Sequence, residues 1–180
     1  MSNVGPWGAV IGAGLLACVS AVCAQQGPSP APDPRDVIPE KLPYNTPYGA
    51  PISAQRAQAV LQAAVAEANK RGWPLNVAVV DSGGSLVAFL RMDGAQLASI
   101  TVAEHKARAA AKFRRPTKAF EDAVQKQDSK YVLTLDDVIA SRGGIPLIED
   151  GKLIGAIGCS GGTGSQDEVA CAAGAATINR

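Results

Sequence analysis

The chain has 180 residues, a length typical of one domain, and a formal net charge of +1. Because the charges nearly cancel and no basic block or acidic tail occurs, the sequence argues against nucleic acid and against electrostatic docking on anionic lipid. Aromatic residues make up only 4% of the chain, which argues against a base-stacking platform, while 47% hydrophobic residues suffice for a core.

Residues 1–24 are predicted to be a signal peptide, because they contain no Asp, Glu, Lys or Arg. The run from Ala9 to Ala24 is too short for a membrane span and ends in the small residues Val22-Cys23-Ala24, as a cleavage site does. We expect a periplasmic or secreted protein with no membrane span after processing; an uncleaved anchor is the alternative. The mature chain keeps only Cys159 and Cys171, which can form a disulfide or stay as two buried thiols.

Residues 25–50 contain seven prolines and no periodic apolar pattern, which predicts a flexible, extended arm. Tyr44 and Tyr48 near its end are candidates to attach it to a neighbouring surface. Residues 51–180 are predicted to be the folded domain.

The first predicted element is a helix that Ser53 caps and that Gly72 ends. A Val-rich hairpin follows, then an Ala-rich helix and a shorter helix that Thr117 can cap. The stretch 131–142 is ambiguous, since Thr134 with Asp137 resembles a capping box but the stretch can equally be irregular. A second hairpin and a final helix complete the chain. The predicted strands are 75–81, 86–92, 145–149 and 153–159, and the later helices are 99–113, 118–126 and 166–178.

Hairpin followed by helix therefore occurs twice. Strands joined by tight turns must be antiparallel. We predict an α+β fold with a single antiparallel sheet, built from two hairpins and flanked by helices.

The chemistry that the sequence permits is narrow, because the mature chain has one histidine, His105, and one methionine, Met92. One His and two dispersed Cys do not make a convincing zinc site. The chain lacks Cys-x-x-Cys-His, which excludes covalent haem attachment, and it lacks a Walker loop. These absences favour a binding protein over an enzyme.

His105 lies in the predicted Ala-rich helix. At 100° per residue, Thr101, His105, Arg108 and Lys112 share one stripe of that helix. An imidazole beside a hydroxyl and two cations can ligate haem iron while the cations face the propionates. We therefore name His105 as the candidate iron ligand, with Thr101 and Arg108 beside it. The plainer alternative is a solvated helix face that carries a surface histidine.

Two loops are further candidates for binding. Gly161 and Gly162 lie between a predicted strand and helix, where consecutive amides can point at one anion, although glycine turns of this kind are common. Arg91 and Met92 end the second predicted strand and could supply a carboxylate clamp and a soft axial ligand. A methionine at a strand end is more often part of the core.

Several blocks of the sequence resemble the GlcG/HbpS family, and they occur in the same order between about Ser53 and Ile178. The resemblance implies a compact antiparallel sheet with helices, oligomeric assembly, and haem binding as in some members. The chain is also similar to the C-terminal domain of PduO-type corrinoid adenosyltransferases. The resemblance carries over no haem ligand, so His105 and Thr101 rest on the helix argument alone. The blocks are Val79-Val80-Asp81-Ser82-Gly83-Gly84, Arg91-Met92-Asp93-Gly94-Ala95, Lys106-Ala107-Arg108 with Arg115-Pro116-Thr117, Gly143-Gly144-Ile145-Pro146, and Gly155-Ala156-Ile157-Gly158 continuing through Ser160-Gly161-Gly162 to Gln166-Asp167-Glu168.

The sequence thus predicts an exported homo-oligomer that binds haem non-covalently, for storage, scavenging or sensing. One alternative is an oligomeric accessory protein of a periplasmic oxidation pathway that binds a small hydroxy acid or an aldehyde. Another is an enzyme that uses Asp81 or Asp93 as a base.

Overall fold

The computed structural model describes residues 31, 33 and 36–179, in two units that divide between Glu40 and Lys41. The second unit contains every helix and strand named below. The predicted signal peptide and the first part of the predicted arm lie outside the described residues. Among the described residues, no helix is long and apolar enough to cross a membrane.

Helix α1 (Ala54–Arg71) begins and ends where the sequence predicts. The Arg56 amide donates to the Ser53 side chain at its start, and Gly72 adopts φ +68° at its end. That left-handed conformation costs glycine little, because it has no Cβ.

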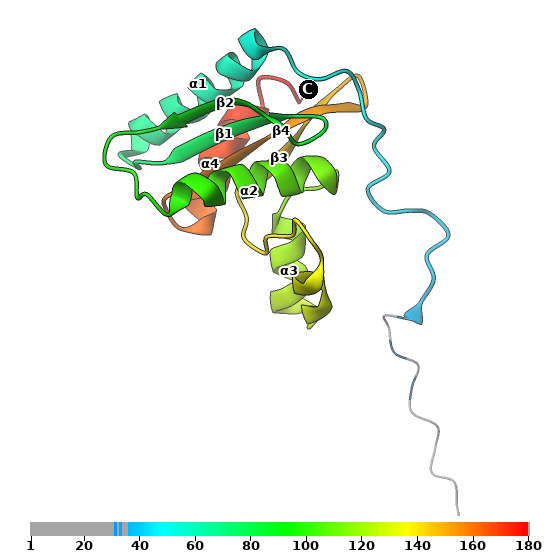
Figure 1. The fold of residues 1–180 in the computed structure, drawn as a ribbon. Helices are drawn as coiled ribbons and strands as arrows, with labels where there is room; N and C mark the ends of the chain where they lie inside the picture. Colours follow the sequence, from blue (N-terminus) through cyan, green and yellow to red (C-terminus); the bar gives the residue numbers. More distant parts are fainter. Residues whose placement is uncertain (1–30, 32, 34–35, 180) are drawn as a thin grey trace, which may run out of the picture. The chain divides into compact units, whose positions relative to one another are not determined.

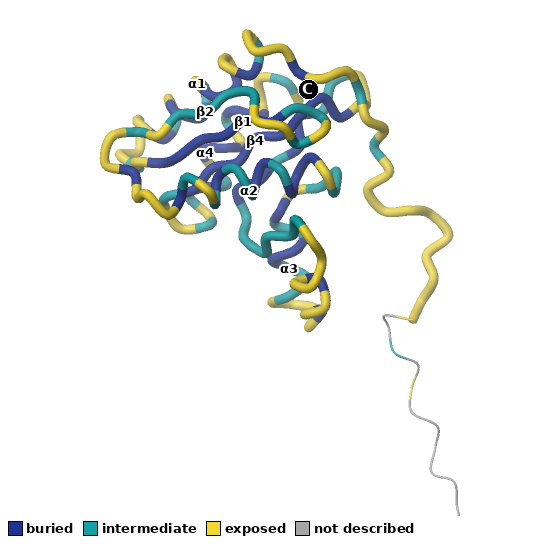
Figure 2. The backbone as a smooth tube through the Cα atoms, viewed as in Figure 1, coloured by how far each residue is buried: buried dark blue, intermediate teal, exposed yellow. Residues whose placement is uncertain are grey.

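The sheet consists of β1 (Asn76–Asp81), β2 (Leu86–Arg91), β3 (Gly144–Glu149) and β4 (Lys152–Ser160). Its order is β2-β1-β4-β3, and every neighbouring pair is antiparallel, which confirms the predicted α+β fold (Figure 1). The two hairpins join through β1 and β4, which are also the most buried strands (Figure 2).

Helices cover both faces of this sheet (Figure 1). Helices α1 and α4 (Gly164–Ala175) cover one face, and α2 (Ser99–Lys112) covers the other. Each face has its own apolar core, and the core beneath α2 is mostly alanine. Small residues let α2 approach closely: a Cβ at Gly158 would collide with the backbone of Ala103 and Ala107.

Helix α3 (Lys118–Lys126) and the 3₁₀ helix η2 (Lys130–Thr134) form a small projection beyond α2 (Figure 1). The predicted side-chain cap by Thr117 is wrong, and of the two alternatives for the stretch 131–142 the capping box does not form. Thr117 adopts helical backbone angles, and its Oγ1 accepts a hydrogen bond from the Gly144 amide at 2.9 Å instead. Thr134 donates to the Tyr131 carbonyl at 2.7 Å, so it does not form a box with Asp137.

The end of the proline-rich segment pairs with the domain. The Leu153 amide donates to the Pro47 carbonyl, and the Gly49 amide donates to the Leu153 carbonyl, at 2.8 and 2.7 Å. The Tyr48 hydroxyl donates to the Lys112 carbonyl at 2.8 Å. Tyr48 therefore does attach this segment to the domain, and ordered packing begins before residue 51.

Cys159 and Cys171 form a disulfide, so the alternative of two buried thiols does not hold. The disulfide connects the central strand β4 to α4, and both cysteines are fully buried. Helix α4 starts two residues before the predicted position, because Thr163 and Gln166 form a capping box.

Candidate functional site

The structure separates the seven predicted site residues into two groups. Thr101, His105 and Arg108 lie along α2, whereas the other four gather at one end of the sheet. At that end, Asn76 pairs with both Arg91 and Ser160. Met92 and the loop of Gly161 and Gly162 directly follow those paired strand ends.

His105 is half-buried on α2 and forms no hydrogen bond with any residue that the structure describes. Arg108 and Lys112 follow it along the helix and lie beside the β1–β2 turn. Their side chains come within 3.2 and 3.3 Å of the position that a Cβ on Gly84 would take. Thr101 is exposed, and its hydroxyl donates to the Ala98 carbonyl at 3.2 Å. The predicted stripe therefore exists as a set of neighbouring side chains, with the imidazole unpaired.

Two carboxylates accompany this stripe. Lys112 Nζ lies 2.6 Å from Asp137 Oδ2, and Arg108 lies 4.0 Å from Glu104. The hydrogen bond from Lys112 lowers the pKa of Asp137, and the charges of Arg108 and His105 act in the same direction. Asp137 therefore pairs with Lys112 and lies near Arg108 and His105, an arrangement that the sequence did not predict.

At the sheet end, Met92 Sδ and the Gly162 amide already have hydrogen-bond partners. Met92 Sδ accepts the Leu75 amide at 3.4 Å, and Arg91 is exposed. The Gly162 amide donates to Asp167 Oδ1 at 3.0 Å, and the Thr163 amide donates to Gln166 Oε1 at 2.8 Å. The side chains of Asp167 and Gln166 therefore occupy these two amides, which can bind an anion only if those hydrogen bonds break.

A buried ion pair lies behind this loop. Lys106 Nζ is 2.8 Å from Asp167 Oδ2, and the two side chains are only 1% and 3% exposed. Because Asp167 also accepts the Gly162 amide, the pair joins α2, α4 and the glycine loop. This pair was not predicted from the sequence. The resemblance blocks contain both residues, but nothing in their spacing pairs them.

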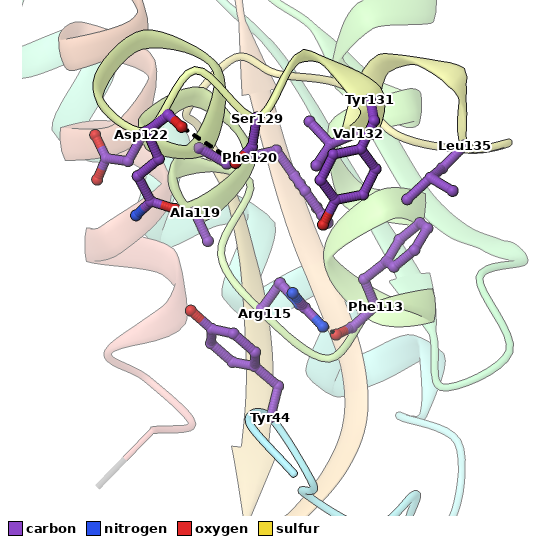
Figure 3. Close-up of a pocket in the computed structure, with 12 residues that line it drawn as sticks. Tyr44, Phe113, Arg115, Ala119, Phe120, Asp122, Ser129, Tyr131, Val132 and Leu135 are labelled. Atoms are coloured by element: carbon purple, nitrogen blue, oxygen red, sulfur yellow. Dashed lines mark hydrogen bonds between the residues drawn. The ribbon is translucent and has the colours of Figure 1, made fainter. Parts of the chain in front are cut away.

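A pocket of about 500 Å³ lies between the C-terminal end of α2, α3 and η2 (Figure 3). Four aromatic side chains line it, namely those of Tyr44, Phe113, Phe120 and Tyr131. The Arg115 guanidinium lies 4.0 Å from the Tyr44 ring centroid, and its Nε donates to the Phe113 carbonyl at 3.1 Å. The pocket was not predicted from the sequence, because Tyr44 comes from the segment before α1 whereas the other lining residues lie between Phe113 and Leu135.

An acidic side chain at the same pocket is already paired. Asp122 forms ion pairs with Lys118 and Lys126, with nitrogen–oxygen distances of 2.5 and 2.8 Å. Hydrogen bonds from these two lysines lower the pKa of Asp122 to about 2. Asp122 is therefore a carboxylate whose charge its own helix neutralises.

Residues 52–176 match the family model described as "Haem degrading protein HbpS-like". The chain belongs to this HbpS-like family. Protein GlcG of Escherichia coli K12 is 39% identical over 108 residues, which cover 60% of this chain and 80% of that protein.

Solved structures of HbpS-like proteins share the fold. A double mutant of Streptomyces reticuli HbpS superposes with a TM-score of 0.68 at 28% identity, covering 84% of this chain and all of that one. PduOC in complex with haem superposes with a TM-score of 0.65 at 31% identity, covering 72% of this chain and 96% of that one.

Proposed function

We propose that this HbpS-like chain is an exported haem-binding protein in which His105 is the protein ligand to the iron. Its role would be haem storage, scavenging or sensing. The observation that carries the proposal is the unpaired, half-buried imidazole of His105, held on a helix beside two cations. The PduOC relative in complex with haem supports the same cofactor.

The residues around His105 fit haem in two respects. A histidine nitrogen is a common axial ligand, and Arg108 and Lys112 supply charges that complement propionates. Glu104 and Asp137 already pair with these cations, so propionates compete with two carboxylates. Bound haem would supply iron-centred redox chemistry, while the chain holds the iron and neutralises the propionates.

Other side chains that ligate haem iron are less available. Met92 Sδ already accepts a hydrogen bond, and Cys159 and Cys171 are bonded to each other. Tyr131 is exposed at the aromatic pocket and remains the next candidate. His105 is therefore the first candidate for the iron ligand, and Tyr131 is the second.

Export is supported by the disulfide, because disulfides persist mainly in oxidising compartments. The charge-free N-terminal run supports it from the sequence. The intact mass of the exported protein tests this: a chain that begins at Gln25 agrees with the proposal, and one that retains residues 1–24 contradicts it.

Haem titration of the purified protein tests the ligand assignment. We expect a Soret band in the wild type, and a shifted maximum with faster haem loss in His105→Ala. Thr101→Val is the matched control on the same helix and should act less. Asp137→Asn should tighten haem retention, because it frees Lys112 from its carboxylate.

An unchanged spectrum in His105→Ala would refute the ligand, and Tyr131→Phe would then be tested. A chain that takes up no haem but binds small hydroxy acids would favour the accessory-protein alternative. A Soret band that persists for hours indicates haem storage, whereas a band that fades indicates haem degradation.

A further inference from the structure

The aromatic pocket does not include His105 and offers a site of its own. Phe113, the first lining residue after α2, follows His105 by eight positions, or about 12 Å of helix. Its volume of about 500 Å³ is within the range of small-ligand sites.

Aromatic residues, which are rare in this chain, line the pocket. The chain has eight aromatic residues in total, and half of them line this one pocket. The rings of Phe113 and Phe120 meet edge to face, with centroids 5.1 Å apart. Ala119 and Ala123 of α3 also line the pocket, and their small side chains occupy little of its space. A planar apolar group fits such walls, because aromatic rings prefer offset or edge contacts with one another.

The Arg115 guanidinium is the charged group of the pocket that has no ion-pair partner among the described residues. Arg115 is the only Lys or Arg in the lining, and its two terminal nitrogens donate to no acceptor among the described residues. Burial is the main cause that lowers the pKa of Arg115, so its charge is poorly solvated. Asp122 does not neutralise it, because Lys118 and Lys126 already hold that carboxylate. The Tyr131 hydroxyl points toward the Arg115 side of the pocket (Figure 3).

Backbone strain is concentrated at the same place. Of the five non-glycine residues described with positive φ, three flank the pocket: Tyr44 at +57°, Arg114 at +54° and Asp128 at +51°. Left-handed backbone is unusual for tyrosine and arginine, and such residues cluster where a binding site over-determines the local conformation. Arg114 directly precedes Arg115, whose guanidinium lies 4.0 Å from the Tyr44 ring centroid.

We propose that this pocket is a second ligand site, which takes an aromatic monocarboxylate. The carboxylate pairs with the Arg115 guanidinium, and the ring packs among Tyr44, Phe120 and Tyr131. A planar guanidinium suits this role, because it can bind a carboxylate through two parallel hydrogen bonds. The site is independent of haem binding at His105.

Calorimetric titration of the haem-free mature protein with phenylacetate, benzoate and indole-3-acetate tests the proposal. At least one acid should bind, and phenylacetamide, which keeps the shape but lacks the charge, should bind about tenfold or more weakly than phenylacetate, the loss of one charged hydrogen-bonded pair. This comparison needs no variant, so it stands even if a mutant fails to fold.

Variants then locate the site. Arg115→Met should lose about tenfold or more in affinity, Arg115→Lys should retain part of it, and His105→Ala should bind as the wild type does. Arg71→Met, at the end of α1, is the matched arginine control, because Arg71 does not line the pocket. The proposal is overturned if no acid binds up to about 10 mM, if the acid and amide bind equally, or if Arg115→Met is unchanged.

Adding haem to the acid-bound protein tests whether this pocket is independent of the haem site. If haem displaces the bound acid, the pocket belongs to the haem site and its independence is refuted. If haem fails to bind anywhere while the acid still binds at Arg115, the proposed function fails and this inference stands.

Discussion

Replacing Lys106 by methionine removes one charge of a buried ion pair while keeping the length of the side chain. The partners are 2.8 Å apart and only 1% and 3% exposed, so the remaining Asp167 carboxylate would lack both its counter-ion and water. Breaking a buried pair in this way costs about 3–5 kcal/mol of the free energy of unfolding.

Lys112→Met is the matched control, since it makes the same change on the same helix. Its pair with Asp137 is as short, at 2.6 Å, but the side chains are 42% and 33% exposed. Exposed pairs contribute about 0–1 kcal/mol, because water screens them. Guanidinium unfolding should therefore separate the two variants by about 3 kcal/mol, or by about 10 °C in melting temperature for a domain of this size.

The double variant Lys106→Met with Asp167→Asn completes the test. Asparagine keeps an acceptor for the Gly162 amide but carries no charge, so the double variant should be more stable than Lys106→Met alone. The reasoning is refuted if Lys106→Met costs no more than Lys112→Met, or if the double variant loses as much as the two single variants added together.

Three further predictions concern stability. Replacing Cys159 and Cys171 by alanine should remove about 3 kcal/mol from the free energy of unfolding, because the crosslink closes a short loop in the unfolded chain; thiol alkylation of the denatured, unreduced mature protein should find no free cysteine. Gly151→Val should cost about 1–2 kcal/mol and Gly151→Asn much less, because φ is +72° and a Cβ there meets no atom within 4 Å, so only backbone strain acts. The pKa of Asp122 is about 2 in the folded chain, against an ordinary value of 3.8. Its contribution should therefore be complete above pH 3.8 and lost as the pH falls through about 2, and the difference in melting temperature between wild type and Asp122→Asn should shrink over that range.

Local signals predicted most of the elements. Ser53 and Gly72 mark the ends of α1 because a cap and a left-handed stop act within a few residues. The two hairpins followed from apolar runs separated by tight turns, of which Asp150–Gly151 has positive φ at both positions. The predictions failed where a polar side chain found a distant partner, as Thr117 did at Gly144.

The predicted stripe on α2 followed from helical periodicity, which places Thr101, His105 and Arg108 on one face regardless of the rest of the fold. The loop that brings Asp137 onto that face could not be predicted, because its position depends on how η2 packs. The aromatic pocket is hidden from the sequence for the same reason.

The sequence by itself determined the helices, the two hairpins and their antiparallel pairing, since capping, turn chemistry and side-chain periodicity act over a few residues. Only the tertiary structure decided that β1 pairs with β4, that Lys106 meets Asp167, that Cys159 bonds Cys171, and that four aromatic rings surround Arg115. These contacts join residues far apart in the chain, or depend on how a strand and a helix pack together. Each of them depends on how the layers assemble, which is a property of the whole domain rather than of any segment.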